Sequence, residues 1–352
     1  MPESSSQPVP SFADDFHCGL WMPLVQKYLP SILVDDDAFA KIDAMASRLP
    51  GTVQGAIEVR LGAEPAPVDF SVRIGNAKAA RSLAPYVHPE HVRDFLRGWA
   101  EDPDPRVPFL WAEFDLDRPM DELQPIFIVR TDGGDGPTVD WVLQDLLRET
   151  LGVEPPEAQK ATVRRALETV PKHGTLVYVF DLRCRGSDTL RLDFYGLHPN
   201  DMQTTLRDLG RPDLAAALEK AGELAADATR FHFNFDVDTD GEILPRLGIE
   251  ASYPVFGRRG SKWEDLLDTL VSAGLCTAEK KEAVLDWPGY TARGAEPELW
   301  PLGADGPEGF LIRSLSHVKL VCRPDHEPEA KIYLLFGRQV RNAEGKLMIA
   351  TD

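Results

Sequence analysis

Polar and apolar residues alternate along ten short stretches of this chain, and the stretches come in five pairs. The pairs span residues 55–74, 109–130, 175–197, 230–253 and 317–337. A period of two places alternate side chains on opposite faces, as in a β-strand with one buried face. The pattern therefore predicts five β-hairpins.

Segments with the character of helices surround these pairs. They span residues 14–29, 35–49, 77–101 (interrupted near His88 and Pro89), 138–151, 156–170, 199–209, 212–227, 262–273 and 277–286. The hairpins begin at residues 55, 109, 175, 230 and 317, which is too uneven for a recent duplication. We interpret the repeat as one of structure, not of sequence.

The helices must bury their own apolar stripes, and the apolar face of the strands is the available surface. If they cover that face, the polar face turns inward as the sheet closes. A sheet of about ten strands tends to close or split, and closure removes exposed edges. The prediction is an α+β fold, a ten-strand antiparallel β-barrel surrounded by helices. An open sheet with its polar face in water is the alternative.

Composition adds limits to this picture. The 352 residues are 43% hydrophobic, enough for one large core, and we interpret residues 13–352 as a single barrel domain.

Residues 1–12 resemble no secretory signal, and their composition predicts a disordered tail. With no apolar run of about 18 residues and a net charge of −19, we expect a cytoplasmic protein with no membrane span and no affinity for nucleic acid. Four widely spaced cysteines indicate reduced thiols.

Two loops need separate interpretation. Residues 287–309, rich in Gly, Pro and Trp, form a connection longer than the usual limit of about 12–15 residues, which predicts a lid. Residues 236–241 copy the start of a calcium loop, but Leu247 stands where a bidentate Glu is required. Asp-Gly is a strong hairpin signal, so we predict a turn there.

The polar faces of the strands predict the lining of the barrel. The predicted set is Glu58, Arg60, Asp69, Ser71, Arg73, Trp111, Glu113, Asp115, Arg191, Asp193, Tyr195, His232, Asn234, Asp236, Arg246, Glu250, Ser252, His317, Lys319, Lys331 and Tyr333. Arg, Lys and Tyr from several hairpins suit a diphosphate, because charge-assisted hydrogen bonds strengthen away from water. The carboxylates in the set either pair with these cations, hold a divalent ion or orient an acceptor.

This pattern resembles the ABBA prenyltransferases, over roughly residues 55–337. The family includes bacterial aromatic prenyltransferases, fungal dimethylallyltryptophan synthases and cyanobactin peptide prenyltransferases. Its fold is a ten-strand antiparallel barrel of successive ααββ units that holds the substrates inside. Inward Arg, Lys and Tyr side chains bind the diphosphate, often as K-x-Y or R-x-K-x-Y along a strand.

Short motifs carry the resemblance. Lys331 and Tyr333 match K-x-Y, and the run from Arg191 to Tyr195 matches the longer form with Asp193 where a Lys is usual. Residues 317–319 are similar to the strand that partners Lys331.

The resemblance implies transfer of a prenyl group from an allylic diphosphate to an aromatic small molecule or a peptide side chain. It implies that Glu58, as the catalytic residue, orients the acceptor or takes its proton, unless Glu58 forms an ion pair with Arg60 or Arg73. The expected diphosphate-binding residues are Arg73, Arg191, Tyr195, Arg246, Lys319, Lys331 and Tyr333. The expected acceptor pocket contains Trp111, Glu113 and His232. No cofactor is required, although Mg²⁺, which some bacterial and peptide-acting members use, would fit an acidic lumen.

The competing hypothesis is a barrel that binds a peptide or a lipid-like ligand without transfer chemistry. Three or more cations that converge on one phosphate-sized space favour transfer. Cations that are each paired with a carboxylate favour binding alone.

Overall fold

The computed structural model describes residues 17–49, 54–63, 67–87, 90–118, 125–134, 136–152, 154–253, 257, 259–301, 309–341 and 347–349. The predicted tail over residues 1–12 lies outside the described residues, as do His88 and Pro89. The tail therefore stays a prediction.

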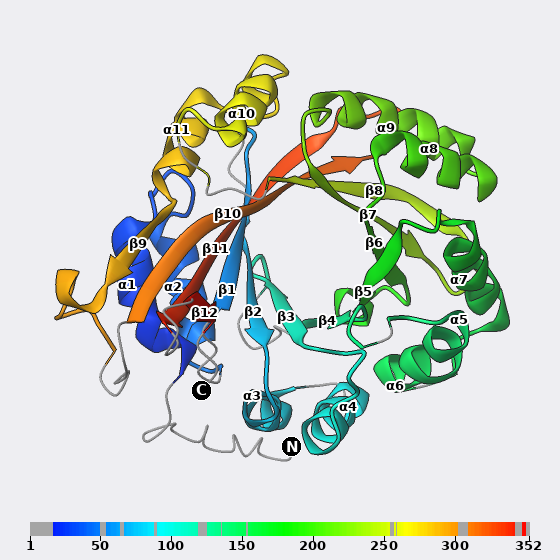
Figure 1. Ribbon diagram of the computed structural model, residues 1–352, viewed down its shortest axis with the longest axis horizontal. Coiled ribbons are helices and arrows are strands. Elements are labelled where there is room, and N and C mark those ends of the chain that lie inside the picture. The colour runs from blue at the N-terminus through cyan, green and yellow to red at the C-terminus, as the bar shows by residue number, and fades with distance from the viewer. Residues whose placement is uncertain are drawn as a thin grey trace, which may run out of the picture.

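Ten strands form a closed antiparallel barrel, which confirms the predicted architecture (Figure 1). Neighbours in sequence pair from β1 to β8, then β8 pairs with β10, β10 with β11, and β11 closes the ring on β1. The strands are β1 Gln54–Arg60, β2 Asp69–Ile74, β3 Leu110–Asp115, β4 Ile126–Arg130, β5 Thr175–Asp181, β6 Leu190–Tyr195, β7 Arg230–Val237, β8 Ile243–Ser252, β10 Gly309–Cys322 and β11 Glu329–Arg341. An open sheet is excluded.

Helices precede each of the five hairpins and stand outside the barrel (Figure 1). They are α1 Met22–Tyr28, α2 Asp36–Ala46, α3 Ala77–Leu83, α4 Glu90–Glu101, α5 Val139–Trp141, α6 Leu147–Leu151, α7 Glu157–Thr169, α8 Pro199–Asp208, α9 Pro212–Leu224, α10 Lys262–Ser272 and α11 Ala278–Asp286. A π-helical turn, η3 Val142–Leu146, joins α5 to α6. Short 3₁₀ turns are η1 Cys18–Trp21, η2 Ala84–Tyr86, η4 Arg183–Arg185 and η5 Arg293–Ala295.

Side-chain caps explain where several of these helices begin. The carboxylate of Asp35 accepts a hydrogen bond from the Ala38 N–H at the start of α2, at 2.8 Å. Asn76 caps α3 in the same way, and Thr277 caps α11. Such caps satisfy backbone donors that have no partner within the helix.

The main apolar core lies between the barrel and its helices. Outward-facing strand residues such as Ile57, Leu192 and Leu334 are fully buried and join the helices in one continuous cluster. In most strands the apolar side chains therefore lie on the outer face, and the polar side chains point into the interior.

The prediction of one long connection without strands over residues 287–309 is wrong at the start of that range. Strand β9 Gly289–Ala292 pairs with β10, and β10 begins at Gly309 instead of near His317. Arg313 of β10 holds this segment in place through the Trp287 carbonyl oxygen (3.2 Å) and the Thr291 hydroxyl (2.8 Å). Residues 302–308 lie outside the described residues. A short strand, β12 Leu347–Ile349, extends the sheet beside β11.

The predicted turn between β7 and β8 is confirmed. The Asp238 carboxylate accepts hydrogen bonds from the backbone N–H groups of Asp240 (3.0 Å) and Glu242 (2.8 Å). Gly241 has a φ of +79°, a conformation that glycine adopts at little cost.

Three cysteines, Cys18, Cys276 and Cys322, are buried free thiols. Within the described ranges, every helix is too short or too polar to cross a membrane.

Replacement of Leu334 by Ala tests the outer core. Leu334 is 0% exposed, so Leu334→Ala should lower the free energy of unfolding by about 2–5 kcal/mol, because it leaves a cavity. Ile32→Ala is the control, since Ile32 is 47% exposed and should cost within about 0.5 kcal/mol. Urea denaturation measures both, and equal losses would contradict the assignment of the core.

Candidate active site

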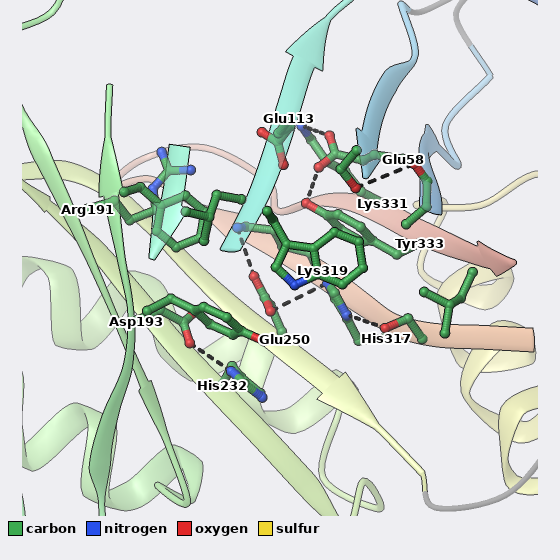
Figure 2. Close-up of a pocket in the computed structure, with 18 of the residues that line it drawn as sticks. Glu58, Glu113, Arg191, Asp193, His232, Glu250, His317, Lys319, Lys331 and Tyr333 are labelled. Carbon is green, nitrogen blue, oxygen red and sulfur yellow. Dashed lines mark hydrogen bonds and ion pairs between the residues drawn. The ribbon is translucent and has the colours of Figure 1, made fainter. Parts of the chain in front are cut away.

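The barrel encloses a cavity of about 170 Å³ to which all ten barrel strands contribute. Figure 2 shows many of the side chains that line it. Its lining is Ala56, Glu58, Ser71, Trp111, Glu113, Ile128, Tyr178, Phe180, Arg185, Arg191, Asp193, His232, Arg246, Glu250, Ser316, His317, Lys319, Lys331, Tyr333 and Leu335. An engineered cavity of about 150 Å³ accepts benzene. The enclosed part of the barrel therefore has room for a group at least as large as an aromatic ring.

Two of the predicted site residues lie away from this cavity, and the others line it. The Arg73 guanidinium stacks 4.0 Å above the Phe109 ring and donates a hydrogen bond to Gln54 Oε1 at 3.1 Å. Tyr195 ends β6 and is 39% exposed. Both point to the same side of the sheet as the lining residues but stand beyond its enclosed part.

Glu58 is the centre of a buried cluster at the seam between β1 and β11. Lys331 Nζ donates to Glu58 Oε1 at 2.5 Å, and the Tyr333 hydroxyl donates to Glu58 Oε2. The partner of Glu58 is thus Lys331, not Arg60 or Arg73. Burial alone would raise the pKa of Glu58, but Lys331 and the hydrogen bonds hold that pKa well below its usual range.

Asp69 lies directly opposite Glu58 across the β1–β2 pair. Burial, and next the charge of Glu58, raise the pKa of Asp69 from 3.8 to about 9. Asp69 therefore carries a proton at neutral pH and shares it with Glu58 through a hydrogen bond between the two carboxyl groups. Glu58 stays ionised, so it is suited to accept hydrogen bonds and poorly suited to take up a proton.

Ion pairs also hold the other acidic groups of the lumen. Arg191 donates to Asp236 from two nitrogens, at 2.6 and 3.0 Å. Lys319 Nζ donates to Glu250 Oε1 at 2.9 Å. Arg185 lies within 3.2 Å of Glu113, and it also bonds Asp115 from two nitrogens.

Arg246 differs from these cations. It lines the cavity, and within the part of the chain that is described it has no ion pair or hydrogen bond. Burial lowers its pKa, and the positive charges of Arg191 and Arg185 lower it further, while the charge of Asp236 partly opposes them. Three guanidinium groups thus converge at this side of the cavity, and one of them has all its donors free.

An apolar wall completes the cavity, and the sequence pattern revealed only Trp111 of it. Ile128 and Phe180 form a small cluster of their own, against which Trp111 and Tyr178 pack. Strands β4 and β5 are apolar on both faces, so alternation does not tell which side points inward. The strand register shows which side points inward, because successive cross-strand neighbours share a face. These neighbours are Trp111, Ile128, Phe180 and Arg191. Arg185 was missed because it reaches the lumen from the η4 turn.

The order of helices and strands and the enclosed polar cavity together define the barrel fold of the ABBA aromatic prenyltransferases. Prenyltransferase PriB in complex with product diphosphate shares this fold with a TM-score of 0.51 and 13% identity, over 90% of this chain and 94% of that one. The 5-dimethylallyl tryptophan synthase from Streptomyces coelicolor gives 0.48 and 15%, over 91% and 95%. Neither a protein-family model nor a curated sequence matches the chain.

Asp69→Asn tests the shared proton. Because the folded pKa is raised, the contribution of Asp69 to stability is fully present below pH 3.8 and is lost as the pH rises to about 9. Asn donates the same hydrogen bond without ionising. The variant should therefore unfold at a higher temperature than the wild type at pH 8.

This advantage should shrink toward pH 5, on the order of 1 kcal/mol for each pH unit. The control is Asp94→Asn, whose side chain is 62% exposed. Thermal melts at several pH values measure the difference. Parallel pH profiles for wild type and Asp69→Asn would show that Asp69 is ionised in the folded protein.

Proposed function

We propose that the protein is a prenyltransferase that takes an allylic diphosphate into the barrel and moves its prenyl group to an aromatic small molecule or a peptide side chain. The observation that carries the proposal is Arg246, a free cation at a cavity beside Arg191 and Arg185. The shared fold supports it, since PriB has been crystallised with product diphosphate.

The diphosphate would bind at the guanidinium side of the cavity. Arg246 offers all its donors, and Arg191 keeps one terminal nitrogen outside its pair with Asp236. Lys319 Nζ has further N–H groups beyond the one that Glu250 accepts. Charge-assisted hydrogen bonds from these groups would stabilise the charge that develops on the departing diphosphate. Arg73 and Tyr195, which lie outside the cavity lining, are left out of this site.

The apolar wall would hold the prenyl chain. Trp111, Tyr178 and Phe180 face the cavity with aromatic rings. An allylic cation over such a ring gains about 2 kcal/mol when water is excluded. In the transfer the C–O bond to the diphosphate breaks, a bond from the prenyl carbon to the acceptor forms, and the acceptor loses a proton, which the released diphosphate takes up.

Glu58 would orient the acceptor. Its carboxylate is ionised and held by Lys331, Tyr333 and Asp69. A carboxylate with a low pKa is a weak general base, because proton transfer works best near the operating pH. Glu58 would therefore accept a hydrogen bond from an N–H or O–H of the acceptor and leave proton removal to the released diphosphate.

The cavity fits Mg²⁺ poorly. Mg²⁺ prefers oxygen ligands in octahedral geometry, whereas the lumen carboxylates are mostly bonded to Lys and Arg. The one group of three candidate ligands among the described residues includes a histidine, His232. No step of the proposed reaction passes through Mg²⁺.

Binding without transfer remains a second candidate, and a specific observation favours it. Apart from Arg246, the cationic Arg and Lys side chains of the described cavity lining are paired with carboxylates, as in Lys331–Glu58 and Lys319–Glu250. Such an interior is close to neutral and suits a ligand that is itself polar but not strongly anionic.

Calorimetry with dimethylallyl diphosphate tests the proposal. Arg246→Gln should weaken binding at least tenfold, because it removes the cation whose donors are free. Arg73→Gln is the matched control and should bind like the wild type, since Arg73 lies outside the cavity lining.

Equal affinity in wild type and Arg246→Gln would reject the assigned diphosphate site. No binding of any allylic diphosphate, with or without Mg²⁺, would reject the enzyme. Mass spectrometry then separates the two candidates: transfer requires a prenylated acceptor after incubation with aromatic amino acids or peptides, and a diphosphate that is bound but never consumed favours the binding barrel.

A further inference from the structure

We infer that Arg73 binds a carboxylate of the acceptor at the mouth of the barrel, beside Arg130 and over the Phe109 ring. The mouth is the end of the barrel at which β2 and β4 lead into helices. The acceptor would therefore be an aromatic acid, with its ring in the cavity and its carboxylate at the mouth. The inference rests on the proposed function, because it names the substrate class of that reaction.

One row of cross-strand neighbours places a cation at each end of the apolar wall. The row is Arg73 of β2, Trp111 of β3, Ile128 of β4, Phe180 of β5 and Arg191 of β6. These five strands are successive neighbours in the barrel (Figure 1). Since neighbouring strands are about 4.8 Å apart, about 19 Å of wall separates the two ends of the row. The row can therefore hold two separate anionic groups, with apolar surface between them.

Arg73 carries a positive charge that no carboxylate pairs with in the described part of the chain. Its Nη1 donates to the neutral amide oxygen of Gln54 at 3.1 Å, and its Nε is buried without a hydrogen bond. The other terminal nitrogen, Nη2, makes no hydrogen bond to a described residue either. A partly buried charge is costly without a partner, so an anion that reaches Nη2 would stabilise this end of the wall.

Arg130 adds positive charge at the mouth but has no donor to spare. Its Nη2 donates to Asp132 Oδ2 at 2.6 Å, its Nε donates to the other oxygen of that carboxylate, and its Nη1 donates to the Tyr178 hydroxyl at 3.0 Å. The guanidinium carbons of Arg73 and Arg130 lie 4.0 and 5.0 Å from the centroid of the Phe109 ring. Two cations thus share one carboxylate among the described residues, and this cluster keeps a net positive charge in a chain of net charge −19.

A carboxylate fits this cluster better than a diphosphate does. A carboxylate brings one negative charge, which matches the one cation that has no acidic partner there. A guanidinium also bonds a carboxylate with defined geometry, because both groups are planar. A diphosphate carries more charge, and the three guanidinium groups of Arg185, Arg191 and Arg246 meet that charge at the other end of the wall.

The acceptor ring would lie between these two ends. Trp111 lines the cavity, and its ring contacts that of Phe109 edge to face, with centroids 6.4 Å apart. Arg73 is the direct cross-strand partner of Trp111, and such partners have Cα atoms only about 4.5–5.5 Å apart. An aromatic ring that packs on Trp111 would therefore bring a carboxylate on a short side chain within reach of Arg73.

Calorimetry with paired acids and amides tests the site without any diphosphate. The probes are three propionic acids that carry a phenyl, a 4-hydroxyphenyl or a 3-indolyl ring, each compared with its primary amide. In the wild type, at least one acid should bind about tenfold or more tightly than its amide, because the hydrogen bond to the acid is charge-assisted at both ends. Arg73→Gln should remove this preference and leave the affinity for the amide unchanged, since Gln keeps a donor but has no charge.

Arg97→Gln is the matched control. The Arg97 side chain is 55% exposed on α4, outside the barrel, so this variant should keep the full preference for the acid. Arg73→Lys keeps the test decisive if Arg73→Gln fails to fold. It retains the charge and loses the planar fork, so the preference should fall without disappearing, and an unchanged preference would count against the site.

The site is overturned if the wild type binds none of the probes, or binds every acid and its amide equally well. A preference for the acid that survives in folded Arg73→Gln has the same consequence. Weaker binding of dimethylallyl diphosphate by Arg73→Gln would assign Arg73 to the diphosphate and also overturn the inference. Because the acid and amide titrations contain no diphosphate, the carboxylate site can fail while the diphosphate site at Arg246 stands, and the reverse.

Discussion

The structure depends on the pairing of charges inside a closed barrel. Once the apolar face of every strand is covered by helices, the polar face has no route to bulk water except through the cavity. A buried charge is costly unless it has a partner. The pair Lys331–Glu58 joins β11 to β1, the two strands that close the ring, so the contact that stabilises the charges also lies at the closure of the barrel.

This constraint shapes what the cavity can bind. Arg191, Lys319 and Lys331 are all bonded to carboxylates, which lowers the positive charge that an anionic ligand would meet. The exception is therefore informative. Arg246 makes no ion pair or hydrogen bond among the described residues, and Asp236 acts on it only through its charge. Arg246 is therefore suited to an anionic ligand in the cavity.

Alternation in the sequence was enough to find the strands and most of the inward side chains. It placed Glu58 and Lys331 correctly, because a strand with one apolar face has only one inward set. It placed Arg73 and Tyr195 on the right side of the sheet but could not tell how deep in the barrel they lie. It missed Phe180, since β5 is apolar on both faces and a bulge between Leu176 and Tyr178 shifts its register.

The sequence by itself determined the ten strands, the helices between them and the polarity of the interior, because these follow from local periods of two and 3.6 residues. Only the tertiary structure decided which charges meet. Glu58 and Lys331 are 273 residues apart in sequence, and nothing local distinguishes Lys331 from Arg60 or Arg73 as a partner. Partner choice depends on strand order and register, which follow from the pairing of β11 with β1 that places Tyr333 opposite Glu58.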